Sequence, residues 1–347
     1  MKPNAPPRTL TAPLSALSFL PILAAVLAAL LAGCAAYPGL DRPSMHEDRA
    51  AVLRERLLDG RSGDVMIVAH RACWAEGPPE NSLDAIASCI RMGVEMVEID
   101  VAITRDGVPV LMHDPTLDRT TDGAGRVEDR TLAEIKALRL RRAAGGTAAP
   151  LTEERIPTLE QALRIAKGKI LINLDVKGEL FGQAFAVVER VGVADQILMK
   201  MDAFPEDSEL LQAAFLHKTM FMPIIRECGI HPVPAKCSPR LSDIVPRYDA
   251  LAPVAYELVF ADLAWLGEGR EAMREGAGRI WVNTLNPYLA AGVTDEKALQ
   301  DPDANWGKVL DMGANMIQTD QPRTLIAYLE SRKGLPARQP AERGDGR

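Results

Sequence analysis

Short apolar runs alternate along most of the chain with longer stretches in which apolar residues recur every three or four positions. We interpret eight of the apolar runs as strands, at residues 64–70, 94–101, 170–176, 196–200, 219–225, 254–260, 279–285 and 315–319. Continuous apolar strands separated by amphipathic helices are typical of a parallel sheet that is covered on both faces. The pattern therefore predicts an α/β fold, a (β/α)8 TIM barrel.

The clearest helical pattern follows the first predicted strand. Four of its apolar residues recur at helical spacing: Leu83, Ile86, Ala87 and Ile90. Asn81 or Ser82 can cap the start of this helix, and Gly93 can end it before the next strand. An earlier helix, predicted at residues 51–58, carries leucines that can cover the bottom of the barrel.

A long insertion separates the second and third predicted strands, at about residues 102–169. Its turn signal, Thr104-Arg105-Asp106-Gly107, predicts a hairpin-like extension over residues 102–112. Short helices are predicted at residues 132–138 and 159–165. We therefore expect a single barrel domain with a small insertion, although length alone would suggest two domains.

The N-terminus has the pattern of an export signal. A basic start and a long apolar run lead to Leu31-Ala32-Gly33-Cys34, which fits the lipobox of a bacterial lipoprotein. An uncleaved membrane anchor remains the alternative, because the run is close to the length of a membrane span. The predicted divisions are a signal peptide (1–33), a tether (34–50) that begins at lipidated Cys34, the barrel domain (51–335) and a disordered tail (336–347).

Ala35, rather than an aspartate retention signal, follows Cys34 and predicts a lipid-anchored protein of the outer membrane that faces the periplasm. Removing residues 1–33 takes away Lys2 and Arg8 and no acid, so the net charge changes from −7 to −9. An acidic chain argues against a nucleic-acid partner and against a polybasic membrane-binding surface.

Four cysteines remain after export to an oxidising compartment: Cys73, Cys89, Cys228 and Cys237. Cys228 and Cys237 bracket a short loop that a disulfide would close, and Cys73 and Cys89 are a second possible pair. Free buried thiols are the alternative for both pairs. The spacing of cysteines and histidines does not match that of a zinc site.

Acidic residues interrupt two of the most apolar runs. Glu98 and Asp100 point to the same side of one predicted strand, about 7 Å apart. Asp175 lies near the end of a run that is too apolar for a solvated acid. Because strand ends face the mouth of a barrel, the three carboxylates are expected to share a cation, and oxygen ligands favour Mg²⁺ or Ca²⁺.

Two histidines, His70 and His113, each follow an apolar run and precede a charged residue, Arg71 or Asp114. Strand-end imidazoles that flank a carboxylate pair predict an acid–base site around a divalent metal. A hydrogen-bonded core histidine is the competing interpretation for each.

Six motifs, in order, resemble the signature of the glycerophosphodiester phosphodiesterase family. They are His70-Arg71-Ala72, Pro79-Glu80-Asn81-Ser82, Glu98-Ile99-Asp100, His113-Asp114, Asn173-Leu174-Asp175-Val176-Lys177 and Gln318-Thr319-Asp320-Gln321-Pro322. The resemblance spans roughly residues 64–330. It implies metal-dependent hydrolysis of a glycerophosphodiester to sn-glycerol 3-phosphate and an alcohol, through attack by the glycerol 2-hydroxyl and a cyclic phosphate.

The resemblance also implies roles for individual residues. His70 and His113 are the expected acid–base pair, and the three carboxylates the expected metal ligands. Arg71 and Lys177 are expected to bind the phosphate, and Glu80 to be a further ligand or to orient Arg71. Asp320 is expected to have a structural role only.

Three positions depart from the family pattern: Ala72 and Asp175 replace its usual Gly and Glu, and Asn283 stands where a Trp is common. Asp175 resembles the ligand of the related sphingomyelinase D toxins. A sphingomyelinase D-like or phosphatidylinositol-type phospholipase acting on membrane lipids therefore stays open as an alternative. An inactive barrel that serves as an envelope binding lipoprotein is an alternative from another class.

Overall fold

The computed structural model describes residues 48–60, 62–176, 180–273 and 278–334. The predicted signal peptide, Cys34, Lys177 and the predicted tail lie outside the described residues. Within the described part of the chain, no helix is both long and apolar enough to cross a membrane.

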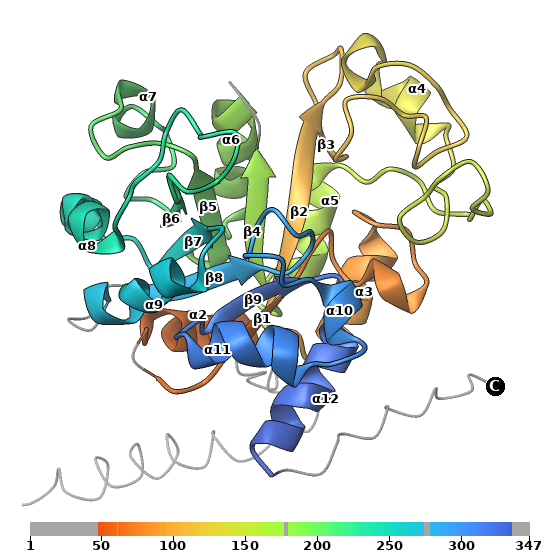
Figure 1. The fold of residues 1–347 in the computed structure, drawn as a ribbon. Coiled ribbons are helices and arrows are strands. Elements are labelled where there is room, and N and C mark those ends of the chain that lie inside the picture. Colours follow the sequence, from red (N-terminus) through yellow and green to blue (C-terminus); the bar gives the residue numbers. More distant parts are fainter. Residues whose placement is uncertain (1–47, 61, 177–179, 274–277, 335–347) are drawn as a thin grey trace, which may run out of the picture. The chain divides into compact units, whose positions relative to one another are not determined.

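The strands form one closed barrel with an added edge strand (Figure 1). They are β1 (Met66–Ala69), β2 (Met96–Ile103), β3 (Pro109–Leu111), β4 (Leu171–Val176), β5 (Ile197–Met201), β6 (Met220–Arg226), β7 (Ala255–Val259), β8 (Arg279–Asn283) and β9 (Met316–Thr319). All barrel strands pair in parallel in the order β1-β9-β8-β7-β6-β5-β4-β2, and β2 pairs with β1 to close the barrel. The predicted (β/α)8 barrel is confirmed, because each of its eight strands overlaps a predicted apolar run.

Helices connect the strands and cover the outside of the barrel (Figure 1). The α-helices are α2 (Arg49–Leu58), α3 (Leu83–Met92), α4 (Leu132–Lys136), α5 (Leu159–Ala166), α6 (Phe181–Val191), α7 (Ser208–Leu211), α8 (Leu241–Ile244), α9 (Leu263–Ala272), α10 (Asp295–Ala298), α11 (Lys308–Asp311) and α12 (Pro322–Arg332). Short 3-10 helices are η1 (Trp74–Glu76), η2 (Val127–Asp129), η4 (Ala194–Gln196) and η5 (Val245–Leu251), and η6 (Asp303–Gly307) is a π-helix.

Helix α2 closes the N-terminal end of the barrel. Its Leu53 and Leu57 pack into the barrel interior against residues at or near the strand starts: Met66, Met96, Leu171, Leu198, Met220, Ala255 and Met316. Apolar side chains therefore fill the interior of the barrel at this end, as the leucines of the predicted 51–58 helix suggested.

The insertion lies between β2 and β4 and has a small core of its own. Strand β3 pairs antiparallel with β2, so the predicted hairpin-like extension is present. The core consists of Val110, Met112, Leu117, Val127, Ile135, Leu140 and Ile156. This packing holds the loop that follows β3, which carries His113, beside the mouth of the barrel (Figure 1).

Both possible disulfides are present. Cys73 pairs with Cys89, which ties the loop after β1 to helix α3, and Cys228 pairs with Cys237 after β6. The first bond constrains a loop whose backbone is unusual, because Arg71 and Ala72 have φ angles of +52° and +64°. This left-handed region favours glycine, which gives a physical reason for the glycine usual at the position of Ala72.

Candidate active site

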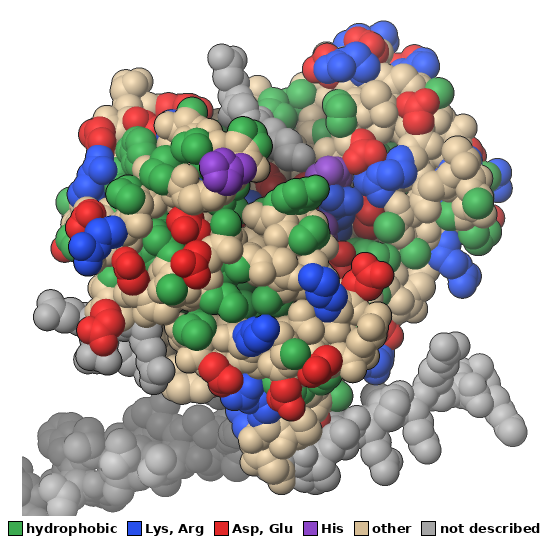
Figure 2. All heavy atoms as spheres, in the orientation of Figure 1, with side chains coloured by type: hydrophobic (Ala, Val, Ile, Leu, Met, Phe, Trp, Pro, Cys, Tyr) green, Lys and Arg blue, Asp and Glu red, His purple; other side chains and the backbone are tan. Residues whose placement is uncertain are grey.

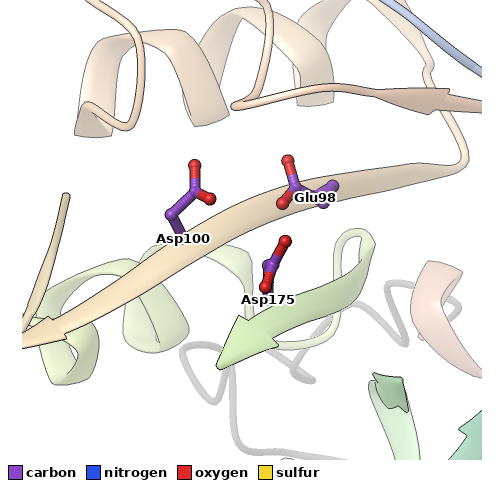
Figure 3. Close-up of side chains that lie close together, drawn as sticks. All are labelled: Glu98, Asp100 and Asp175. Atoms are coloured by element: carbon purple, nitrogen blue, oxygen red, sulfur yellow. The ribbon is translucent and has the colours of Figure 1, made fainter. Parts of the chain in front are cut away.

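Three carboxylates converge at the C-terminal ends of β2 and β4. Candidate ligand oxygens of Glu98, Asp100 and Asp175 all lie within 4.8 Å of one another (Figure 3). The strand register explains this, because Asp100 and Asp175 are direct partners in the β2–β4 ladder. Glu98 and Asp100 are buried, and the side chain of Asp175 is 29% exposed, so the cluster opens toward the mouth on the side of β4.

Neighbouring groups fix the orientation of the two buried acids. The backbone N–H of Arg71 donates to Glu98 Oε2 at 2.9 Å. Asn81 donates from Nδ2 to Asp100 Oδ2 at 2.8 Å and accepts the Asp100 N–H through Oδ1 at 3.1 Å. Of the two predicted caps of helix α3, Ser82 is the one observed, since its side chain accepts the N–H of Ala85. Asn81 positions Asp100 instead.

The electrostatics of this cluster suit a cation. Burial and the charge of Asp100 raise the pKa of Glu98 to about 7, although His70 and Lys200 act in the opposite direction. Carboxylates crowded in this way repel one another unless a proton or a metal lies between them. Three carboxylate groups form a donor set that hard cations such as Mg²⁺ and Ca²⁺ prefer, so these residues fit a divalent metal.

His70, which follows β1, binds a carboxylate that follows the last strand of the barrel. Its Nδ1 lies 2.8 Å from Asp320 Oδ1, which also accepts the indole N–H of Trp74 at 3.1 Å. Burial alone would lower the pKa of His70, but the hydrogen bond to Asp320 and the charge of Glu98 raise it. Asp320, for which only a structural role was expected, thus contacts the imidazole of His70 and fixes its orientation.

His113 belongs to a second His–Asp pair. Its Nδ1 lies 2.7 Å from Asp114 Oδ1. Arg119 contacts both oxygens of Asp114 and both oxygens of Glu80, at 2.7–2.9 Å. The hydrogen bonds of Asp114 to Arg119 and His113 hold its pKa well below the usual range. Arg119 thus fastens the histidine loop of the insertion to the loop after β1.

Glu80 is buried between the two arginines. It accepts from Nη1 of Arg71 at 3.2 Å as well as from Arg119, and Arg71 Nε lies 3.5 Å from Asp100 Oδ2. Of the two predicted roles for Glu80, this contact matches the orientation of Arg71. The second predicted phosphate-binding residue, Lys177, lies outside the described residues.

Lys200 on β5 is a buried cation that sequence reasoning overlooked. Its Nζ lies 3.5 Å from Asp175 Oδ2 and 3.6 Å from Glu257 Oε2. Burial lowers the pKa of Lys200, but the carboxylates of Glu257 and Asp175 raise it well above the ordinary range, so the ammonium stays charged. The sequence does contain a signal for Lys200, because a charged residue within the apolar run Ile197–Met201 is as unusual as Asp175 in its own apolar run.

Figure 2 shows histidine, basic and acidic side chains gathered in the hollow between the insertion and the rest of the barrel. Two imidazoles, each bound to an aspartate, thus belong to segments that reach the carboxylate cluster: the charge of Glu98 acts on His70, and the backbone N–H of Met112, which precedes His113, donates to the carbonyl of Asp100 at 3.1 Å. Such an arrangement can move a proton on and off oxygen atoms while balancing negative charge on a bound anion.

Comparisons with known proteins cover both halves of the chain. The model of the glycerophosphoryl diester phosphodiesterase family matches residues 70–212, and that of a domain of unknown function matches residues 221–329. The first match contains all described candidate residues except Asp320 and Glu257, which lie in the second.

Two relatives and one solved structure illustrate the similarity. Glycerophosphodiester phosphodiesterase 1 of Mus musculus is 42% identical over 121 residues, which are 33% of this chain and 34% of the relative. The chain thus matches only about a third of that relative's length. Uncharacterized protein YqiK of Bacillus subtilis strain 168 is 30% identical over 276 residues, 76% of this chain and 98% of the relative.

The structure of an Oleispira antarctica phosphodiesterase in complex with the product sn-glycerol-3-phosphate has a TM-score of 0.53 and 19% identity, and the likeness covers 78% of this chain and 99% of that one. This likeness extends the shared fold over nearly all of that protein. The family match spans the carboxylate cluster and both histidines. The chain belongs to the glycerophosphoryl diester phosphodiesterase family.

Proposed function

We propose that the chain hydrolyses glycerophosphodiesters to sn-glycerol 3-phosphate and an alcohol. The observation that best supports this proposal is the convergence of Glu98, Asp100 and Asp175 together with two aspartate-bound histidines, His70 and His113, on neighbouring segments. The family match supports this reaction, and so does the product named in the related Oleispira structure.

Glu98, Asp100 and Asp175 would hold one Mg²⁺ or Ca²⁺ ion. When bound, such an ion stabilises negative charge on phosphoryl oxygens. The guanidinium group of Arg71 lies beside this cluster, with Nε 3.5 Å from Asp100 Oδ2, and its planar shape suits a phosphate. Glu80 keeps Arg71 in place, and we assign Lys177 to the phosphate as well, on its sequence position.

The two imidazoles exchange protons with the substrate. One accepts the proton of the attacking hydroxyl, and the other donates a proton to the departing alkoxide. Asp320 and Asp114 bind Nδ1 of their histidines, so we assign the proton exchange with the substrate to Nε2 of each ring. Water then opens the cyclic phosphate with the two roles reversed.

We further propose that the mature chain is a lipoprotein acylated at Cys34 and held at the outer membrane on its periplasmic side. The lipobox Leu31-Ala32-Gly33-Cys34 supports this assignment. Two disulfides are consistent with export, because such bonds persist in oxidising compartments.

Membrane lipids form a second candidate class of substrates. Asp175 favours this class, because its carboxylate reaches about one methylene less far than the glutamate usual in the family and resembles the sphingomyelinase D ligand. A panel of soluble glycerophosphodiesters, lysophospholipids and sphingomyelin, assayed at equal concentration, separates the two classes. We expect turnover of the soluble diesters, and turnover of the lipids alone would contradict the primary proposal.

Removing the cation provides an independent test of the site. We expect chelation to abolish activity and to lower the melting temperature, because a ligand at 100 to 1,000 times its dissociation constant stabilises the fold by about 3–4 kcal/mol. Restoring Mg²⁺ or Ca²⁺ should recover both. Unchanged activity and unchanged melting temperature in chelator would contradict the metal assignment.

A further inference from the structure

Lys200 lies between two carboxylates without a short contact to either. Its Nζ is 3.5 Å from Asp175 Oδ2 and 3.6 Å from Glu257 Oε2, both longer than the 2.7–2.9 Å typical of a charged hydrogen bond. The lysine side chain is only 9% exposed. Its ammonium is therefore confined to the barrel interior and can approach one acid by moving away from the other.

Glu257 on β7 is held in place from the opposite side. The indole N–H of Trp281 donates to Asn283 Oδ1 at 2.6 Å, which turns the amide group of Asn283 toward Glu257. Asn283 Nδ2 then donates to Glu257 Oε1 at 2.8 Å. These two hydrogen bonds fix the position of the Glu257 carboxylate.

The second oxygen of Glu257 lacks a hydrogen bond. Oε2 is buried and has no hydrogen-bond donor among the residues that the structure describes. A buried carboxylate oxygen without a donor is unfavourable, and the nearby ammonium of Lys200 is suited to supply one. The geometry thus offers Lys200 a second position, closer to Glu257 than the one it occupies.

We propose that Lys200 is a positioning residue that shifts from Asp175 to Glu257 when a divalent cation binds, so that Glu257 sets the cation affinity of the site. A cation held by Asp175 repels the ammonium of Lys200. Lys200 can move away from Asp175 without losing its charged partner only because the carboxylate of Glu257 is available to accept its hydrogen bond. Without Glu257 the lysine stays at Asp175 and competes with the metal. This inference rests on the cation site of the proposed function.

Cation affinity is the direct readout. Glu257→Gln should weaken the binding of Mg²⁺ or Ca²⁺ about 10- to 100-fold, the usual effect of removing a group that supports a metal ligand. Titration calorimetry on the full chain and the rise of melting temperature with added cation both measure the cation affinity independently of enzymatic activity. Glu257→Asp keeps the charge and should retain more affinity than Glu257→Gln, whereas a packing role predicts the reverse order.

The double variant Lys200→Met/Glu257→Gln provides the decisive comparison. Removing the competing ammonium should restore an affinity close to that of the unmutated chain, so the two substitutions should not be additive. Glu95→Gln is the matched control, because Glu95 contacts Ile67 and Arg56 rather than Lys200, and its cation affinity should stay unchanged.

Several outcomes would overturn the proposal. Equal affinity of Glu257→Gln and the unmutated chain would do so, as would a double variant as weak as Glu257→Gln. If Glu257→Gln fails to fold, a Lys200→Met chain that binds the cation at least tenfold more weakly than the unmutated chain refutes a competing lysine. No cation binding by the unmutated chain would contradict both this proposal and the metal part of the proposed function, whereas the other outcomes affect this proposal alone.

Discussion

The two ends of the barrel differ in how their charged side chains are paired. At the N-terminal end, Arg279 on β8 is fully buried and donates to the carbonyls of Leu57, Asp59 and Asp64 at 3.0–3.2 Å. It also donates to Asp64 Oδ1 at 2.9 Å. Burial would raise the pKa of Asp64, but its hydrogen bonds to Ser62, Arg279 and Arg56 bring it well below the usual range. The buried charges at this end thus have partners of opposite sign.

The C-terminal end leaves carboxylates in excess. Glu98, Asp100, Asp175 and Glu257 are grouped around Lys200, and the pKa of Glu98 is raised rather than lowered. Because both ends belong to the same strands, the difference lies in the side chains and not in the backbone. At the N-terminal end the charges are balanced within the fold, whereas the C-terminal end is suited to bind a cation and an anion.

Replacing a histidine at the mouth tests the difference most strongly. His70→Ala or His113→Ala should lower activity by about two to four orders of magnitude, the usual contribution of a positioned proton-transfer group. Stability should stay within about 1 kcal/mol, because neither side chain fills the core. A core histidine would give the reverse: clear destabilisation with activity per folded molecule retained.

A p-nitrophenyl ester of the substrate separates the two histidines, since this leaving group departs without protonation. The variant that lacks the general acid should recover much of its rate on this ester, and the variant that lacks the base should not. The double variant should be little worse than the weaker single one, because groups acting in one step are not additive. Near-normal activity of both single variants would refute the assigned chemistry.

The bottom of the barrel should respond in the opposite way. Arg279→Met should destabilise the fold by about 3–5 kcal/mol, because it leaves the carbonyl oxygens of Leu57, Asp59 and Asp64 without this buried donor and removes one of the donors to the Asp64 carboxylate. Urea unfolding measures this loss, and activity per folded molecule should be unchanged. Arg126→Met is the control: this exposed arginine forms a surface ion pair with Glu128, and its loss should cost less than about 1 kcal/mol.

A smaller effect should appear in the pH dependence of stability. Asp295 lies behind Asp320 and accepts its backbone N–H at 2.7 Å, and burial raises the pKa of Asp295 from 3.8 to about 6. Because the folded pKa is raised, the stabilisation is complete below pH 3.8 and is lost as the pH rises through about 6. The loss should be about 1–3 kcal/mol.

Asp295→Asn cannot titrate, so its stability relative to the unmutated chain should improve as the pH rises from 4 to 7. Urea unfolding at several pH values within this range tests the sign. A constant difference between the two chains would show that Asp295 does not titrate in this window.

Much of the barrel could be predicted from the chain because its strands are buried on both faces. Continuous apolar runs identified all eight strands, and acids within them, such as Glu98 and Asp175, identified the mouth. The hairpin of the insertion was equally visible, since its turn carries Thr104-Arg105-Asp106-Gly107.

The supporting contacts were less visible because they join residues far apart in the chain. Asp320 meets His70 across 250 positions, and Glu257 meets Lys200 across the barrel interior. Asn81 had a sufficient local role as a helix cap, so its contact with Asp100 could not be inferred from helix signals. The contact between His70 and Asp320 becomes apparent only when β1 pairs with β9 in the barrel.

Helix α2 enters the barrel at the end opposite to the carboxylates. A lipid on Cys34 would lie 15 residues before Arg49, a reach of roughly 50 Å when fully extended. Under the proposed lipidation, anchoring would determine the compartment in which the reaction takes place. A reach of this length would not determine which end of the barrel faces the bilayer.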